Sequence, residues 1–285
     1  MTVRRIAAAG ALAAGLVAGS ALAAHAITGG QPDGEGHPNV ALIAFYDATG
    51  RYRCSASLVS STVLVTAAHC TDGTLGKTAI TFDTKIADAP PSPLPVAANP
   101  ATGYTSAELQ AAGYLSGTAH THPDYSDFTD IRNWNDVGVI ELDAPITNIT
   151  PVKVAPEGYL NQFTPSVLNK TLFTSVGYGT EVRQADSGPQ KPTPQSYPLL
   201  RRVTEEKGQK LMPQILQVNG NENDPFGGGG TCFGDSGGPT FKGGYQVTVT
   251  SYGYTSNCRY LGGLQRIDIP VVQEWLAEFG VTAAG

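Results

Sequence analysis

Charged residues are scarce in this sequence. Asp, Glu, Lys and Arg make up 15% of its 285 residues, whereas about 25% is typical of soluble domains. Basic residues number 18 against 24 acidic ones, and a nucleic-acid-binding protein needs a positively charged face. We therefore expect no nucleic-acid partner. The 41% hydrophobic content is enough to fill a sizeable core and excludes wholesale disorder.

Long apolar runs are missing after residue 26, so no later segment resembles a transmembrane helix. Residues 1–26 begin with Arg4 and Arg5, continue through Ala, Gly, Leu and Val, and end in Ala24-His25-Ala26. This order is typical of a secretory signal peptide. A membrane anchor is the alternative, but a run made mostly of Ala and Gly is only marginally hydrophobic. We expect a secreted, extracellular protein that leaves the membrane once its signal is removed.

Cysteine is also sparse, with four residues in the whole chain: Cys54, Cys70, Cys232 and Cys258. In an oxidising compartment four cysteines imply two disulfides, for which three pairings are possible. A zinc site would need Cys or His ligands at finger-like spacing, and these positions show none. The sequence therefore predicts two bridges, no metal site and no cofactor.

Short strands dominate the expected secondary structure, because alternating or β-branched runs recur between turn signals. The predicted strands cover Val40–Tyr46, Ser57–Thr66, Val137–Leu142, Leu172–Gly177, Tyr245–Tyr252 and Leu264–Ile269. Helical spacing occurs weakly at Ser106–Ala112 and more strongly at Pro270–Phe279, which is followed by Gly280. The fold class is therefore all-β with a C-terminal helix. Proline-rich segments at 83–100 and 184–198 indicate loops.

The strongest chemical signal is a serine in a glycine-rich turn, Gly234-Asp235-Ser236-Gly237-Gly238-Pro239. A serine hydroxyl is a weak nucleophile and needs a base, usually oriented by a carboxylate. The histidines are His25, His37, His69, His120 and His122. Of these, His69 follows an apolar strand and precedes a cysteine. Asp136 stands at the mouth of another apolar run, where a buried charge needs a partner such as the N–H of His69.

Chain order separates the possible serine hydrolase classes. The turn also matches the nucleophile elbow of α/β-hydrolases, but these run serine, acid, histidine, and no histidine follows Ser236. A subtilisin-like order requires an acid before His69, and neither Asp33 nor Asp47 lies in a convincing strand context. The order His69, Asp136, Ser236 is that of the chymotrypsin class.

The sequence resembles a secreted chymotrypsin-fold serine protease of the trypsin-like family. The matching motifs, spread over about residues 27–280, are Thr66-Ala67-Ala68-His69-Cys70, His122-Pro123-Asp124-Tyr125, Asn135-Asp136-Val137, Val176-Gly177-Tyr178-Gly179, Gly234-Asp235-Ser236-Gly237-Gly238-Pro239 and Ser251-Tyr252-Gly253. The resemblance implies two six-stranded antiparallel β-barrels, an N-terminal one in residues 27–155 carrying His69 and Asp136, and a C-terminal one with the helix in residues 156–285 carrying Ser236.

The same resemblance assigns roles to individual residues. Ser236 is the nucleophile, His69 the base and Asp136 the acid that orients it, while the N–H groups of Gly234 and Ser236 form the oxyanion hole. It also implies the bridges Cys54–Cys70 and Cys232–Cys258.

The resemblance also implies a pair of residues whose contact activates the enzyme. The segment Ile27-Thr28-Gly29-Gly30 resembles the family's activated N-terminus, with Thr28 as a departure, and its freed amine would pair with Asp235. Signal cleavage after Ala26 would expose Ile27 directly, whereas cleavage after Ala23 or Ala24 would leave a short propeptide.

Counting back from Ser236 places Gly230 at the floor of the substrate pocket, with Thr231 beside it. Ser251, Gly253 and Gly262 would form its walls. Since Gly230 carries no acid, the resemblance predicts cleavage after large apolar or aromatic residues and disfavours Lys or Arg.

The expected function is that of a monomeric endopeptidase acting on protein or peptide substrates. The main alternative is a catalytically inactive homologue that serves as a binding module, although such proteins usually lose a triad member and all three residues are present here. An esterase using the same triad is a third candidate, because acyl transfer covers both bonds.

Overall fold

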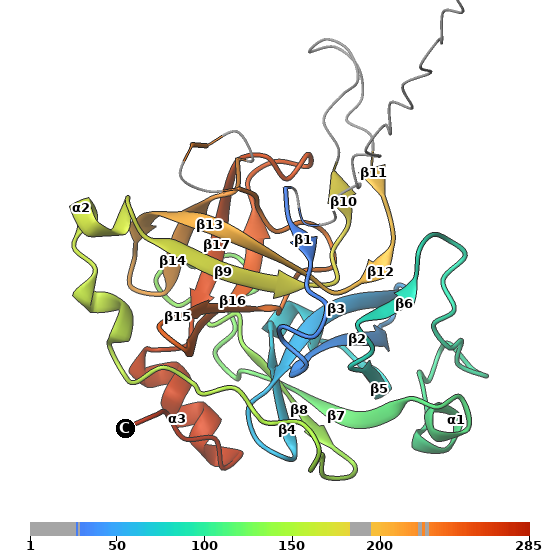
Figure 1. Ribbon diagram of the computed structural model, residues 1–285. Helices are drawn as coiled ribbons and strands as arrows, with labels where there is room; N and C mark the ends of the chain where they lie inside the picture. The colour runs from blue at the N-terminus through green and yellow to red at the C-terminus, as the bar shows by residue number, and fades with distance from the viewer. Residues whose placement is uncertain (1–26, 28, 183–194, 222–223, 226–227) are drawn as a thin grey trace, which may run out of the picture.

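A computed structural model describes residues 27, 29–182, 195–221, 224–225 and 228–285 (Figure 1). The predicted signal peptide, Thr28, Gly227 and most of the 184–198 segment lie outside the described residues. Within the described ranges, no helix is long and apolar enough to cross a membrane.

The first barrel is a closed antiparallel sheet of six strands in the order β2-β3-β4-β8-β7-β5. Its strands are β2 (Val40–Tyr46), β3 (Arg51–Leu58), β4 (Val63–Thr66), β5 (Leu75–Thr81), β7 (Leu115–Thr121) and β8 (Gly138–Leu142). The single strand predicted over Ser57–Thr66 is in fact two, β3 and β4, which are joined by a turn at residues 59–62.

The second barrel contains six antiparallel strands in the order β13-β14-β17-β16-β15-β9, and pairing of β13 with β9 closes it. Its strands are β9 (Leu172–Gly177), β13 (Arg202–Leu211), β14 (Ile215–Asn219), β15 (Pro239–Lys242), β16 (Tyr245–Gly253) and β17 (Leu261–Arg266). The prediction of two six-stranded antiparallel barrels is confirmed. Strands β5, β7, β13, β14 and β15 were not predicted, and β13 lacks the apolar alternation of a core strand because its sequence is rich in charged and polar residues.

The remaining elements connect or cover the barrels. They are β1 (Gln31–Pro32), β6 (Lys85–Ala87), β10 (Glu181–Val182), β11 (Gln195–Ser196), β12 (Leu199–Leu200), the helices α1 (Ser106–Ala111), α2 (Pro165–Leu168) and α3 (Pro270–Glu278), and the 3-10 turns η1 (Ala68–Cys70) and η2 (Tyr159–Gln162). The weak helical signal at 106–112 is confirmed as α1, where Thr105 and Glu108 form a capping box.

Strand β2 is shared by two cores. All seven of its residues are buried, which explains why its sequence is continuously apolar. Ala41, Ile43 and Phe45 face the interior of the first barrel. The alternate residues, including Leu42, pack in a cluster that also contains Tyr178 of the second half. This strand therefore lies at the junction of the two barrels.

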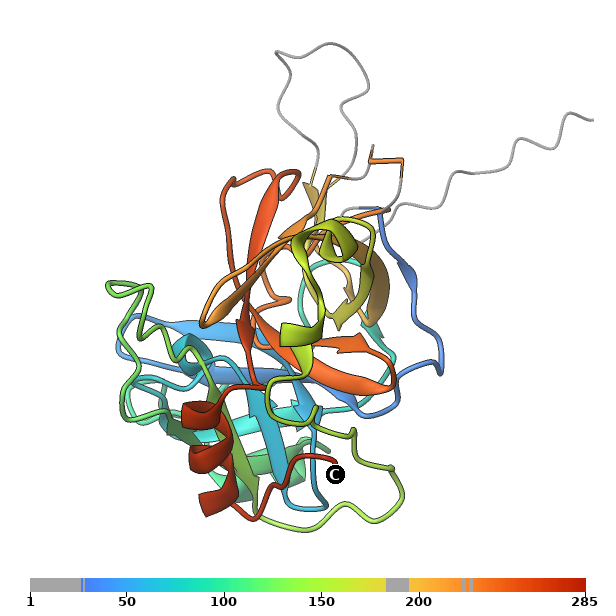
Figure 2. The ribbon, with the colours of Figure 1, turned by 90° about the vertical axis from the view of Figure 1, so that its left-hand side faces the viewer.

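Each end of the described chain packs on the opposite half. The strand β1 pairs with β13 of the second barrel. Helix α3 buries Trp275 and Leu276 in a cluster with Val65 and Val139 of the first barrel, and Figure 2 shows it beside that barrel. The division of the chain at residue 155 stays a prediction.

A buried ion pair fixes the N-terminal segment near β1. The Arg201 side chain is fully buried, its Nε lies 2.8 Å from Asp33 Oδ2, and that carboxylate is 1% exposed. The same guanidinium donates to the carbonyls of Val40, Gly34 and Phe82. The chain is therefore anchored to both halves from Asp33 onward.

Candidate active site

His69 and Asp136 form a close pair on the first barrel. Strand β4 leads into η1, which holds His69, while Asp136 precedes β8, the strand paired with β4. His69 Nδ1 lies 2.9 Å from Asp136 Oδ2, and the His69 backbone N–H donates to Oδ1 at 2.9 Å. The carboxylate is fully buried and the imidazole is 22% exposed, so one face of the base remains accessible.

The second barrel positions the acid. Ser251 Oγ of β16 donates to Asp136 Oδ2 at 2.6 Å. The Asp136 backbone N–H donates to Gln265 Oε1 at 3.1 Å. The preceding residue, Asn135, has φ +46° and exchanges two hydrogen bonds with Gln214. Gln214 and Gln265 were not identified from sequence, because nothing in an isolated glutamine signals a contact across two barrels.

Two opposing effects act on the pKa of His69. Burial of the imidazole disfavours its charged form, but the Asp136 charge and its hydrogen bond outweigh burial and raise the pKa of His69 above 6.5. The pair is therefore suited to accept a proton on Nε2 and to stabilise the resulting imidazolium.

Ser236 lies in a turn that requires glycine on both sides. Gly234 has φ +96° and Gly237 has φ +74°, and a Cβ on Gly237 would lie 1.9 Å from Thr66 Oγ1. Contacts with Ser55 of β3 hold this turn, since the Ser55 N–H donates to the Ser236 carbonyl and its Oγ donates to the Gly234 carbonyl. These two hydrogen bonds hold the turn against the barrel that carries His69.

No hydrogen bond joins Ser236 Oγ to the His69 ring in the described part of the chain, and such bonds are often long without substrate. Among the described residues, the backbone N–H groups of Gly234 and Ser236 donate to no acceptor. Two N–H groups without an acceptor in the described residues, both within the same turn, suit the stabilisation of a developing oxyanion.

Asp235, the residue before Ser236, is fully buried. It accepts hydrogen bonds from the N–H groups of Gly179 at 2.7 Å and Cys232 at 2.8 Å. Burial raises the pKa of Asp235 to about 7, although those two bonds and the charges of Arg53 and Arg202 act in the opposite direction.

Ile27 is the predicted partner of Asp235. Its side chain is also fully buried, yet within the described residues no hydrogen bond or ion pair joins the two. In this chain the Ile27 nitrogen belongs to a peptide bond with Ala26, so it lacks the charge that would draw it to a carboxylate.

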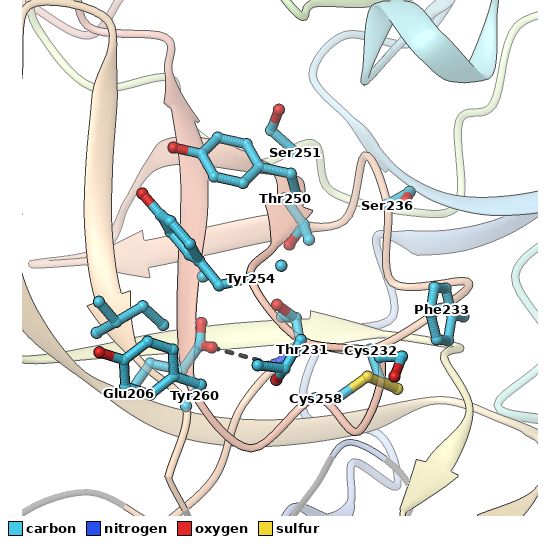
Figure 3. A pocket seen from close by; sticks show the side chains of 17 residues that line it. Glu206, Thr231, Cys232, Phe233, Ser236, Thr250, Ser251, Tyr254, Cys258 and Tyr260 are labelled. Carbon is cyan, nitrogen blue, oxygen red and sulfur yellow. Dashed lines mark hydrogen bonds between the residues drawn. A yellow bond between two sulfur atoms is a disulfide. The ribbon is translucent and has the colours of Figure 1, made fainter. Parts of the chain in front are cut away.

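A cavity of about 390 Å³ opens beside Ser236 (Figure 3). Four of the five pocket residues expected from sequence line it, namely Thr231, Ser251, Gly253 and Gly262. Gly230 does not; it packs against Gly220, whose Cα a Gly230 Cβ would approach to 2.5 Å. Tyr252, Tyr254 and Tyr260 add aromatic surface, so the cavity has room for a large side chain.

Glu206 of β13 also lines this cavity and was missed by the sequence analysis. It is fully buried. Its Oε1 accepts the Thr231 N–H at 3.1 Å and its Oε2 accepts Ser175 Oγ at 2.5 Å. Burial raises the pKa of Glu206 to about 7 despite these two bonds. A signal did exist, because Arg202, Thr204 and Glu206 share one face of a strand with period 2.

Both disulfides have the predicted pairing. Cys54–Cys70 joins β3 to η1 beside His69, and Cys232–Cys258 joins two segments that line the cavity. The two sulfurs of the first bridge and a nitrogen of His69 lie within 4.8 Å of one another. Because a disulfide offers no thiolate, this cluster is unsuited to a metal ion.

Comparison with known proteins gives one family and several relatives. The family model described as Trypsin matches residues 27–276. A trypsin-like protease of Streptomyces glaucescens is 27% identical over 191 residues, which cover 66% of this chain but only 59% of that protein. Brachyurin of Leptuca pugilator is 28% identical over 213 residues, covering 73% of this chain and 78% of that protein.

Solved structures agree in fold. The structure of HL collagenase has a TM-score of 0.58 at 16% identity, covering 86% of this chain and 94% of that one. The scabies mite inactivated protease paralogue S-D1 has a TM-score of 0.57 at 15% identity, covering 91% and 100%. At these identities the likeness establishes the two-barrel fold alone.

Proposed function

Because the chain belongs to the trypsin family, we propose that it is a serine endopeptidase whose triad is His69, Asp136 and Ser236. The observation that carries the proposal is the buried Asp136 carboxylate 2.9 Å from His69 Nδ1, beside a cavity that Ser236 lines. The substrates are proteins or peptides. The enzyme acts outside the cell as a monomer, after removal of residues 1–26.

In the proposed reaction Ser236 Oγ attacks the carbonyl carbon of the scissile peptide bond while His69 Nε2 takes the hydroxyl proton. The N–H groups of Gly234 and Ser236 donate to the negatively charged oxygen that develops. His69 then returns the proton to the leaving amine, and the C–N bond breaks to leave an ester on Ser236. Water, deprotonated by His69, hydrolyses that ester and restores the serine.

Asp136 acts through His69 in this scheme. Its hydrogen bond keeps the proton of the neutral ring on Nδ1, so that Nε2 is free to act as the base, and its charge stabilises the imidazolium. The support from Ser251 and Gln265 of the second barrel limits movement of the carboxylate. The proposed pair therefore depends on both barrels.

We propose that the cavity binds the side chain preceding the cleaved bond and prefers large apolar or aromatic groups. Gly253 supports this, since a Cβ there would meet nothing within 4 Å, and three tyrosines line the same space.

Activation is proposed to follow signal cleavage after Ala26. The new Ile27 ammonium would pair with Asp235 and offset the cost of burying that carboxylate. N-terminal sequencing of the secreted protein tests this step. Fully active material that begins at another residue would contradict it.

Covalent labelling by a fluorophosphonate probe tests the whole proposal. The expected result is labelling of the secreted protein at Ser236, hydrolysis of peptides, and loss of both in Ser236→Ala. Folded protein without labelling would instead identify an inactive homologue that binds a partner. Labelling with hydrolysis of esters but not of peptides would identify an esterase.

A further inference from the structure

Glu206 lies in the substrate cavity but has no place in the reaction scheme above. Figure 3 shows it beside Thr231 and Tyr260, at the end of the cavity away from Ser236. It therefore occupies the position where the tip of a long bound side chain would come to rest. Gly230, the residue expected to form this floor, does not line the cavity.

The carboxylate has spare acceptor capacity. An ionised carboxylate offers about four lone-pair sites, and within the described ranges Glu206 accepts from two donors, the Thr231 N–H and Ser175 Oγ. Both donors are neutral. Burying an unpaired negative charge is costly, so a cation delivered to the cavity would find a favourable partner.

Among the described residues, no basic side chain forms an ion pair with Glu206. The charges that act on it are the carboxylates of Asp235, in the turn before Ser236, and Glu205, next to it on β13. Ser175 of β9 and Thr231 face it as hydroxyl and amide groups. Arg202 lies on the same strand face, but it pairs with Glu181, and its charge acts on Asp235.

Resting on the proposed function, we propose that Glu206 is a specificity-determining residue. When ionised, it pairs with the cation of Lys or Arg and adds cleavage after these residues to cleavage after large apolar ones. When protonated, it leaves a neutral floor that favours apolar side chains alone. The enzyme thus has two substrate classes in one cavity, and pH sets their ratio.

The pH dependence follows from the burial and from the two neighbouring carboxylates, which both disfavour ionisation. They hold the pKa of Glu206 at about 7 in the free protein. A bound cation lowers that pKa again. Selectivity for Lys over Phe should therefore rise as pH increases through neutrality.

Matched peptides that differ only in the residue before the cleaved bond, with Phe, Leu, Lys or Arg, provide the test. For the wild type we expect the Lys/Phe ratio of kcat/KM to rise at least about tenfold between about pH 5.5 and pH 8.5. In Glu206→Gln the ratio should fall about tenfold or more at the higher pH and lose its pH dependence. A wild type that cleaves after Phe but shows the same Lys/Phe ratio as Glu206→Gln overturns the inference.

Glu205→Gln is the matched control. It removes a carboxylate one position away, where the side chain accepts from Thr174 Oγ1 and does not line the cavity. We expect its Lys/Phe ratio at the higher pH to follow the wild type and its pH dependence to persist, with the midpoint moved to lower pH because one carboxylate that disfavours ionisation of Glu206 is gone. Glu206→Gln should fold, because its amide oxygen can accept from Thr231 while its NH₂ donates to Ser175, whose hydroxyl can turn to Thr240 Oγ1 at 2.9 Å.

Competitive inhibition gives a second measurement that does not depend on cleavage after Lys. Against hydrolysis of the Phe peptide, butylammonium should inhibit at least about tenfold more strongly than butanol at about pH 8.5, and this advantage should vanish in Glu206→Gln. Equal inhibition by the two compounds in the wild type contradicts the inference.

Fluorophosphonate labelling distinguishes failure of the specificity proposal from failure of the proposed function. Labelled, Phe-cleaving enzyme without a Glu206 effect rejects only the specificity role. Folded enzyme that is not labelled rejects the proposed function, and with it the inference.

Discussion

The two barrels have the same strand number but different interiors. The first is filled by a cluster of apolar side chains such as Ile43, Leu64 and Ile140. The second half also has an apolar cluster, yet it buries charged groups that include Arg202, Glu206 and Asp235. An apolar interior provides a rigid support for His69 and Asp136. The charged groups lie where substrate selection and activation are proposed to occur.

His69→Ala should remove the catalytic contribution of the first barrel most completely. Loss of the base should lower kcat by about 10⁵–10⁶-fold, while the protein should remain folded because Asp136 keeps the hydrogen bonds from the His69 backbone N–H and Ser251 Oγ. Steady-state hydrolysis of the Phe peptide and urea unfolding measure the two effects. A variant that keeps even about a hundredth of the activity would contradict the assigned role.

Trp275→Ala breaks the apolar contact by which the C-terminal helix covers the first barrel. The side chain is 6% exposed, and its ring makes a tilted contact with His122 and an edge contact with Phe279. Removing it should lower the free energy of unfolding by about 3–5 kcal/mol. Thermal unfolding in a Ser236→Ala background avoids self-digestion. Glu274→Ala, on the exposed side of α3, is the control and should change stability by less than about 0.5 kcal/mol.

Ser251→Ala tests whether the second barrel positions the acid of the first. The variant removes the 2.6 Å hydrogen bond to Asp136, and a bond to a charged group contributes about 1.5–3 kcal/mol. We expect kcat/KM to fall about 10–100-fold. The pKa of His69, as seen in the pH profile of kcat/KM, should also change. Ser256→Ala, which also alters the cavity lining, should leave that pKa in place.

The charged interior of the second barrel has a stability cost that depends on pH. Glu206 has a pKa of about 7 in the folded protein against 4.5 when unperturbed. Between these values the folded state holds a proton that the unfolded state releases, so stability falls as pH rises through this window. Glu206→Gln should reduce that fall by about 3 kcal/mol. Urea unfolding at about pH 4.5 and about pH 8, again in Ser236→Ala, measures it. An unchanged fall would contradict the assigned cost.

The sequence predicted the parts of the molecule that follow simple hydrophobic patterns or short motifs. Strand β2, helix α3 and the turn around Ser236 were all identified because apolar periodicity or glycine spacing marks them. β13 was missed, since its buried face carries Arg202, Thr204 and Glu206 instead of apolar side chains. Hydrophobic alternation cannot reveal a strand that turns charge toward the interior.

The candidate site could be predicted from the sequence to a similar extent. His69, Asp136 and the four cysteines belong to local motifs, and the structure brings them together as expected. Gln214 and Gln265 could not be found, because their contacts depend on how one barrel sits against the other. Gly230 was placed in the pocket by counting, and its packing against Gly220 could only be seen in three dimensions.

The Arg201–Asp33 ion pair has a consequence for how the new N-terminus would search for its partner. Ile27 and Asp33 are six positions apart, so after cleavage the amine moves on a tether of at most about 20 Å. A chain end confined to that radius has a local concentration in the millimolar range. Docking of Ile27 would therefore be an intramolecular step whose extent is independent of protein concentration.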